Sequence, residues 1–68
     1  MLIDDIEKTI QTNPGLTATQ IAKVIYGPQG YGEQVRTGCL ALLRAGRIER
    51  RGRGGSGGPF TYYPVGGS

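Results

Sequence analysis

The chain has 68 residues, a net charge of +3, one cysteine and no histidine. This length fits one small domain, and the composition excludes an internal disulfide, a histidine-based metal site and a serine–histidine pair. No apolar run approaches the roughly 18 residues of a membrane-spanning helix, so we expect a cytoplasmic protein. Because the chain is small and lacks histidine, we expect that it is not an enzyme and needs no cofactor or metal.

The first predicted helix spans residues 2–12. Its apolar side chains recur at helical spacing and form one stripe: Leu2, Ile3, Ile6 and Ile10. Its early carboxylates suit the positive end of a helix dipole: Asp4, Asp5 and Glu7. Asn13-Pro14-Gly15 then predicts a turn. Because this helix is both acidic and apolar, it is a candidate dimer surface.

The second predicted helix spans residues 18–26 and opens on a capping box, with Thr17 at the cap and Gln20 three residues on. A short link, residues 27–32, holds three glycines and a proline and must be a turn. Three helices with a tight connection between the second and third are typical of a helix-turn-helix.

The third predicted helix spans residues 33–45. Its core positions fall at i, i+4, i+7 and i+8: Val35, Cys39, Leu42 and Leu43. Cys39 is expected to be a small buried hydrophobe, with a redox-sensing thiol as the alternative. Gly38 inside a helix costs about 1 kcal/mol relative to alanine, and the close approach of a neighbouring helix or of a ligand backbone would explain it.

Residues 47–65 predict a two-stranded hairpin with a long glycine-rich loop. Alternation predicts three side chains that face the helices: Ile48, Tyr63 and Val65. Phe60 and Tyr62 then lie on the outer face, where structural packing, a dimer contact and a base-stacking platform are the alternatives. Two prolines, Pro59 and Pro64, predict an edge strand. Residues 66–68 are predicted to be a disordered tail.

Charge is distributed unevenly along the chain. Residues 1–35 hold two lysines and four acidic residues, for a net charge of −2, whereas residues 36–68 hold six arginines and one glutamate, for +5. Arginine makes forked contacts to phosphate, so the second half indicates a polyanionic partner. A solvated face that only confers solubility is the alternative.

The order of these elements and several spacings resemble the winged helix-turn-helix family. In that family the second helix often carries a threonine followed four residues later by Ile-Ala, as Thr17, Ile21 and Ala22 are placed here. The third helix matches at five offsets: Val35, Cys39, Leu42, Gly46 and Ile48. Cys39 stands where leucine is usual, and the link before the third helix is slightly longer. The chain is most similar to the stand-alone mini regulators of bacteria, archaea and their phages or plasmids.

The resemblance implies an α+β, mainly α fold of three helices with a two-stranded wing over residues 1–65, and a nucleoid-associated regulator that binds double-stranded DNA. The third helix would enter the major groove, with Gln34, Arg36 and Thr37 at base edges. The other implied DNA-binding residues are Thr17, Thr19 and Lys23 on the second helix, Gln29 and Tyr31 in the turn, Arg44, and the wing residues Arg50, Arg51 and Arg53.

Winged helices also serve as protein-interaction modules, and a fold does not fix a function. The alternative function is therefore an adaptor that binds a larger regulator through its wing or first helix, with little DNA specificity. A monomer this small would read few base pairs, so a specific regulator favours a homodimer or a partner regulator. No small-molecule ligand is expected.

Overall fold

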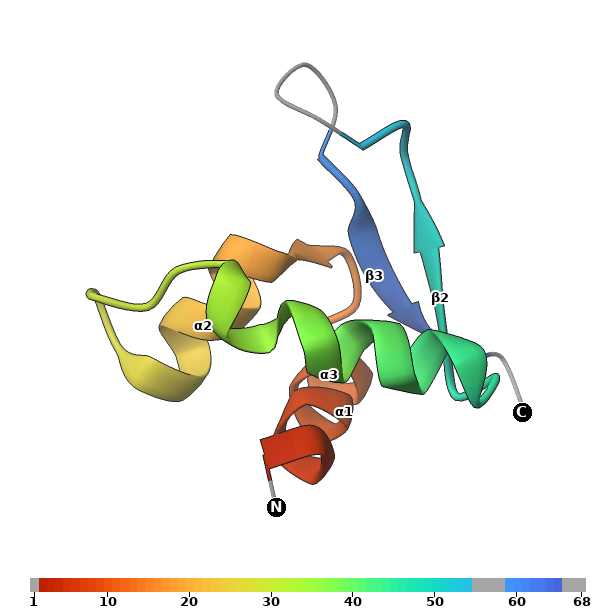
Figure 1. Cartoon of the computed structure of the whole chain (residues 1–68), viewed down its shortest axis with the longest axis horizontal. Helices are drawn as coiled ribbons and strands as arrows, with labels where there is room; N and C mark the ends of the chain where they lie inside the picture. Colours follow the sequence, from red (N-terminus) through yellow and green to blue (C-terminus); the bar gives the residue numbers. More distant parts are fainter. Residues whose placement is uncertain (1, 55–58, 66–68) are drawn as a thin grey trace.

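The computed structural model describes residues 2–54 and 59–65. The order of elements is α1 (Leu2–Thr12), β1 (Leu16–Thr17), α2 (Ala18–Tyr26), α3 (Glu33–Arg44), β2 (Ile48–Arg51) and β3 (Thr61–Pro64) (Figure 1). The predicted α+β, mainly helical class is confirmed, and each helix lies within one residue of its predicted bounds. None of the described helices is long and apolar enough to cross a membrane. The predicted tail, residues 66–68, falls outside the described residues.

The sheet has three antiparallel strands in the order β1-β3-β2, so β3 is the central strand. The expectation of a two-stranded hairpin with β3 at an edge is therefore wrong. The missing partner is β1, which is only two residues long and pairs with Thr61 and Tyr62. Pro64 is tolerated because it lies beyond the end of β1 and pairs only with Ile48 among the described strands.

Strand register decides which aromatic side chain enters the core. Ile48 pairs with Pro64 and Arg50 pairs with Tyr62, so these four share one face. Ile48 is 3% exposed and Tyr62 is 6% exposed, which places that face against the helices. The placement of Ile48 is confirmed.

The predicted phase of β3 is wrong by one residue. Tyr62 is buried and Phe60 packs against the core, whereas Tyr63 is only partly buried and Val65 is exposed. Adjacent tyrosines fit either phase of a two-residue repeat, and a one-residue slip moves every side chain to the other face.

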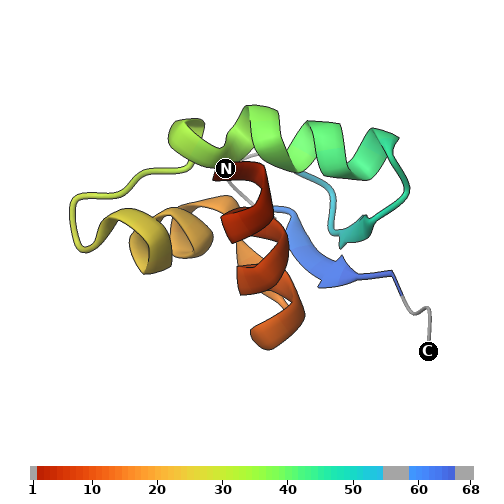
Figure 2. The same ribbon diagram turned by 90° about the horizontal axis from the view of Figure 1, so that it is seen from below.

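The core lies between the three helices and the inner face of the sheet. Its members are Ile6, Ile10, Ile21, Ala22, Val35, Cys39, Leu42, Ile48 and Tyr62. Figure 2 shows α1 crossing the helical layer, where it packs against both α2 and α3. Since Ile6 and Ile10 are wholly buried there, the central part of the apolar stripe of α1 is used inside the molecule and not as a dimer surface.

Gly38 lies where side chains of α1 pack closely against α3. A Cβ atom built at Gly38 would lie 2.5 Å from Cδ1 of Ile6. The neighbouring-helix explanation for this glycine is therefore confirmed, and it accounts for a residue that disfavours the helix it occupies.

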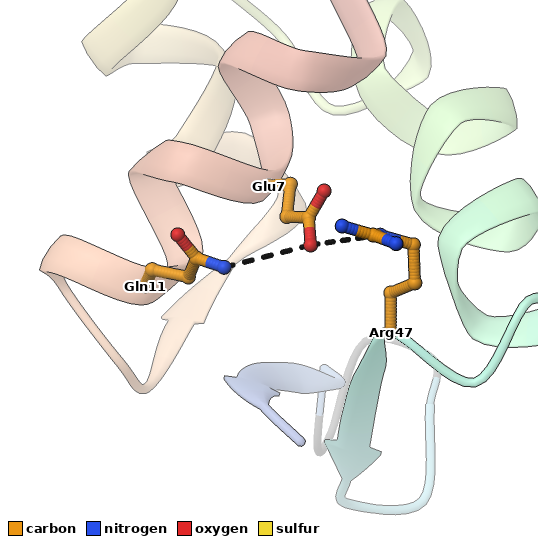
Figure 3. A network of polar contacts seen from close by, with 3 residues as sticks. All are labelled: Glu7, Gln11 and Arg47. Carbon is orange, nitrogen blue, oxygen red and sulfur yellow. Dashed lines mark hydrogen bonds and ion pairs between the residues drawn. The ribbon is translucent and has the colours of Figure 1, made fainter. Parts of the chain in front are cut away.

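One ion pair ties the first helix to the start of the sheet. The Nε atom of Arg47 donates to Oε2 of Glu7 at 2.9 Å, and Nε2 of Gln11 donates to the same oxygen at 3.5 Å (Figure 3). Glu7 is largely buried while Arg47 is exposed. Residues 40 positions apart are thus joined, which fixes where the chain enters β2.

A double-mutant cycle measures this pair. We expect Glu7→Gln and Arg47→Gln to show a coupling free energy of unfolding of about 0.5–1 kcal/mol, because one partner is exposed to solvent. The coupling should shrink as salt is raised from low to molar concentration. Urea unfolding followed by circular dichroism supplies the four free energies, and a coupling that is zero at low salt would contradict the pair.

Cys39 is inaccessible in the folded protein, and burial raises the pKa of its thiol from 9.0 to about 11. We expect alkylation by iodoacetamide at pH 8 to proceed only through unfolding, so that its rate rises with urea. The unfolded thiol ionises first, so the contribution of Cys39 to stability falls as the pH rises from about 9 to about 11. Cys39→Ala should lack that component of the fall, whereas rapid alkylation without urea would contradict burial.

Candidate nucleic-acid interface

The start of α2 is fixed by the predicted capping box. Oγ1 of Thr17 accepts from the backbone N–H of Gln20 at 3.2 Å, and the backbone N–H of Thr17 donates to Oε1 of Gln20 at 2.9 Å. The hydroxyl oxygen and the N–H of Thr17 are thus both engaged within the cap. Thr19 lies exposed in the first turn, where backbone N–H groups point out of the helix. An anion at this end would meet those groups and Thr19 before Thr17.

A groove of about 480 Å³ runs between the start of α2, the exposed side of α3 and the β2–β3 hairpin. In Figure 1 the hairpin rises from the C-terminal half of α3, and the start of α2 lies beside its N-terminal half. Four of the sequence-predicted residues line this groove: Thr17, Thr19, Arg36 and Arg50. The fold therefore brings one arginine from a helix and one from a strand to the same concave surface.

Two arginines of β2 stack on aromatic rings, on opposite faces of the sheet. The guanidinium carbon of Arg50 lies 4.0 Å from the centre of the Phe60 ring, and that of Arg51 lies 4.4 Å from the Tyr63 ring. Stacking holds a guanidinium plane while its N–H edges remain able to donate. Only the Arg50 stack lines the groove.

Both arginines of the groove affect the pKa of Tyr62. Burial is the largest cause of the raised pKa of Tyr62, with a further contribution from Cys39. Arg50 opposes this rise through its charge and a hydrogen bond, and the charge of Arg36 opposes it as well. The Tyr62 hydroxyl is therefore neutral at physiological pH, and Arg36 and Arg50 supply the positive charge of the groove lining.

On α3, the three side chains expected at base edges differ in their exposure. Arg36 and Thr37 are exposed, whereas Gln34 is half-buried and its amide oxygen accepts from the backbone N–H of Tyr31 at 2.9 Å. Arg36 is held by Glu33, with Nη1 of the arginine 3.1 Å from Oε1 of the glutamate.

The remaining predicted residues do not line the groove. They are exposed outside its lining: Lys23 late in α2, Gln29 and Tyr31 in the turn, Arg44 in the last turn of α3, Arg51 on the outer face, and Arg53 after β2. The position of Arg44 suits the negative end of the α3 dipole. Sequence reasoning missed Glu33 as a groove residue, although its i, i+3 spacing to Arg36 indicates such a pair.

No protein-family model matches this chain, and no curated protein or solved structure is significantly similar to it. Within the described ranges, no three histidine, cysteine, aspartate or glutamate side chains are grouped as a metal would need.

Proposed function

We propose that this chain is a small winged helix-turn-helix protein that binds double-stranded DNA as a transcriptional regulator. The N-terminal half of α3 would enter the major groove, and the β2–β3 hairpin would contact the backbone or the minor groove as a wing. Such a protein works in the cytoplasm on the nucleoid. The proposal draws on three helices followed by a hairpin, on the charge of the second half of the chain and on the groove between α3 and the hairpin.

The observation that carries the proposal is that Arg36 and Arg50 line one groove from two different elements. A single exposed arginine is usually just solvated. Two arginines on one concave surface can pair with the phosphates of a DNA backbone, each of which carries one negative charge. The first turn of α2 borders the same groove, and its backbone N–H groups favour anions. Arg36 and Thr37 remain exposed for base edges.

Fluorescence anisotropy of a labelled DNA duplex of random sequence, titrated at several salt concentrations, tests this function. The logarithm of the binding constant should fall with the logarithm of salt, with a slope of about −0.9 for each phosphate contacted. Arg36→Ala and Arg50→Ala should each weaken binding and make the slope shallower by about 1.

Arg51→Ala is the matched control, because Arg51 is the next residue on the same strand and stacks on the opposite face. We expect its binding and salt slope to stay close to those of the wild type. Equal losses from Arg50→Ala and Arg51→Ala would contradict docking through the groove. Wild-type binding weaker than about 10⁻⁴ M at physiological salt would overturn the DNA-binding function itself.

Glu33 should limit affinity for DNA. Its carboxylate lies on the groove and engages Arg36, so it both repels phosphate and restrains the arginine that would reach a base. We expect Glu33→Gln to strengthen binding to random duplex severalfold at low salt, and the gain to disappear as salt rises. Glu49→Gln, an exposed change on β2 that does not line the groove, is the control. Weaker binding by Glu33→Gln would show that the carboxylate is required in the interface.

A specific observation also favours the adaptor function as the second candidate. Val24 on α2 is 58% exposed and borders a groove of about 390 Å³ between α1 and α2, together with Asp5 and Lys8. A single exposed apolar residue is common on a monomer, so the groove beside Val24, and not Val24 alone, favours this candidate. Analytical ultracentrifugation of the wild type and of Val24→Asp tests a homodimer on this side. A dimer that Val24→Asp dissociates, combined with weak DNA binding, would favour this function over the first.

A further inference from the structure

The turn between α2 and α3 is held against α2 by its backbone. The N–H of Gly27 donates to the carbonyl of Lys23 at 2.9 Å, and the N–H of Gly30 donates to the carbonyl of Gly27 at 2.8 Å. Gly30 is buried, and a Cβ atom there would overlap the backbone carbonyl of Ala22. The backbone of residues 27–30, just before Tyr31, is therefore held closely against α2.

Gln34 holds Tyr31 from the other side through a reciprocal pair of hydrogen bonds. Its side-chain oxygen accepts from the Tyr31 N–H at 2.9 Å, while its own backbone N–H donates to the Tyr31 carbonyl at 3.0 Å. The bond to the glutamine side chain is one half of a capping box, but here the backbone carbonyl of Tyr31, and not a side chain, accepts from the N–H of Gln34. Because the side-chain oxygen of Gln34 already accepts one hydrogen bond and the side chain is half-buried, bidentate contact of Gln34 with an adenine would compete with its bond to Tyr31.

The backbone on both sides of Tyr31 is thus fixed, yet the residue is 58% exposed. The next residue, Gly32, lines the groove and lies against the first turn of α2, where its Cβ would be 3.3 Å from Oγ1 of Thr19. An aromatic side chain has two χ angles to order, so a fixed backbone lowers the entropic cost of its contacts. Its hydroxyl is among the groups that commonly donate to DNA phosphates.

We infer that Tyr31 contacts a DNA phosphate at the N-terminal end of α3, and that Gln34 is a positioning residue that acts through Tyr31 instead of reading a base. This inference rests on the proposed DNA binding. It assigns Gln34 a different role from the one that its place on the third helix suggests.

Two measurements test the inference. In the free protein, Gln34→Ala should speed amide hydrogen exchange at Tyr31, whereas Gln34→Glu, which keeps an acceptor oxygen, should preserve the protection. In anisotropy titrations with random duplex, Tyr31→Phe should weaken binding about tenfold, because it removes a hydrogen bond to a charged group. The double variant Gln34→Ala/Tyr31→Phe should bind no more than about twofold weaker than the weaker single variant.

Selection of duplexes from a randomised pool separates positioning from base reading. Gln34→Ala should leave the selected sequences unchanged if it acts through Tyr31. A changed preference at one base pair, additive losses in the double variant, or unchanged exchange at Tyr31 would each overturn the inference. If the wild type binds DNA but Tyr31→Phe binds equally well, the inference alone fails. If the wild type does not bind DNA, the proposed function fails as well.

Discussion

Tyr62→Ala is expected to leave much of the protein unfolded at 37 °C, whereas Tyr63→Ala should leave it folded. Tyr62 is 6% exposed and belongs to the core, and truncation of a buried aromatic residue costs about 3–5 kcal/mol. The single hydrophobic core of a chain shorter than about 70–80 residues rarely supplies more than about 3–5 kcal/mol of stability. The loss at Tyr62 is therefore comparable to the whole stability.

Tyr63 provides the matched comparison, since it is the same residue type one position along the same strand. Its ring is partly buried, stacks with Arg51 and lies near Gly15, so its removal should cost only about 1–2 kcal/mol. Urea unfolding followed by far-ultraviolet circular dichroism measures both changes. Equal losses of stability at the two positions would contradict the register of β3. A larger loss at Tyr63 would show that Tyr63, and not Tyr62, faces the core.

Gly30→Ala is expected to destabilise the protein by about 2–3 kcal/mol, although alanine is larger by only one methyl group. The added Cβ would overlap the backbone carbonyl of Ala22 in α2, and a helix backbone cannot rotate away as a side-chain terminus can. The turn would have to shift, and Tyr31 would shift with it.

Gln29→Ala is the control for this change, because Gln29 is the preceding residue and is exposed. Its stability should stay within about 0.5 kcal/mol of the wild type. Thermal unfolding and ¹⁵N–¹H spectra measure the effect, and Gly30→Ala should displace amide signals in the turn and at the start of α3. Wild-type stability in Gly30→Ala would contradict the close packing of the turn on α2.

The helices were predictable because their signals are local. The apolar spacing of α1 and α3 repeats over several turns, and the capping box of Thr17 and Gln20 marks the start of α2. Strand β1 was not predictable, since two residues carry no alternation and the strand exists through its pairing with β3. The face of β3 was ambiguous because Tyr62 and Tyr63 are adjacent, so only the register selects between them.

The candidate site divides in the same way. The arginine-rich second half was evident from sequence, but adjacent arginines on a strand point to opposite faces, and the sequence does not say which of Arg50 and Arg51 lines the groove. The bond from Gln34 to Tyr31 depends on the shape of the turn, which glycines determine through close contacts with α2. Helical spacing therefore predicted that Gln34 lies on the third helix, but it did not predict the hydrogen bond between Gln34 and the N–H of Tyr31.

Chemical-shift mapping tests the central claim most directly. The ¹⁵N-labelled protein is titrated with unlabelled random duplex, and the amide signals that move are located on the structure. DNA binding through the groove predicts the largest shifts at Thr19, Arg36 and Arg50, with little change at Lys8 and Thr12 beside the groove between α1 and α2. Shifts concentrated at Lys8 and Thr12, or no shifts at all, would contradict it.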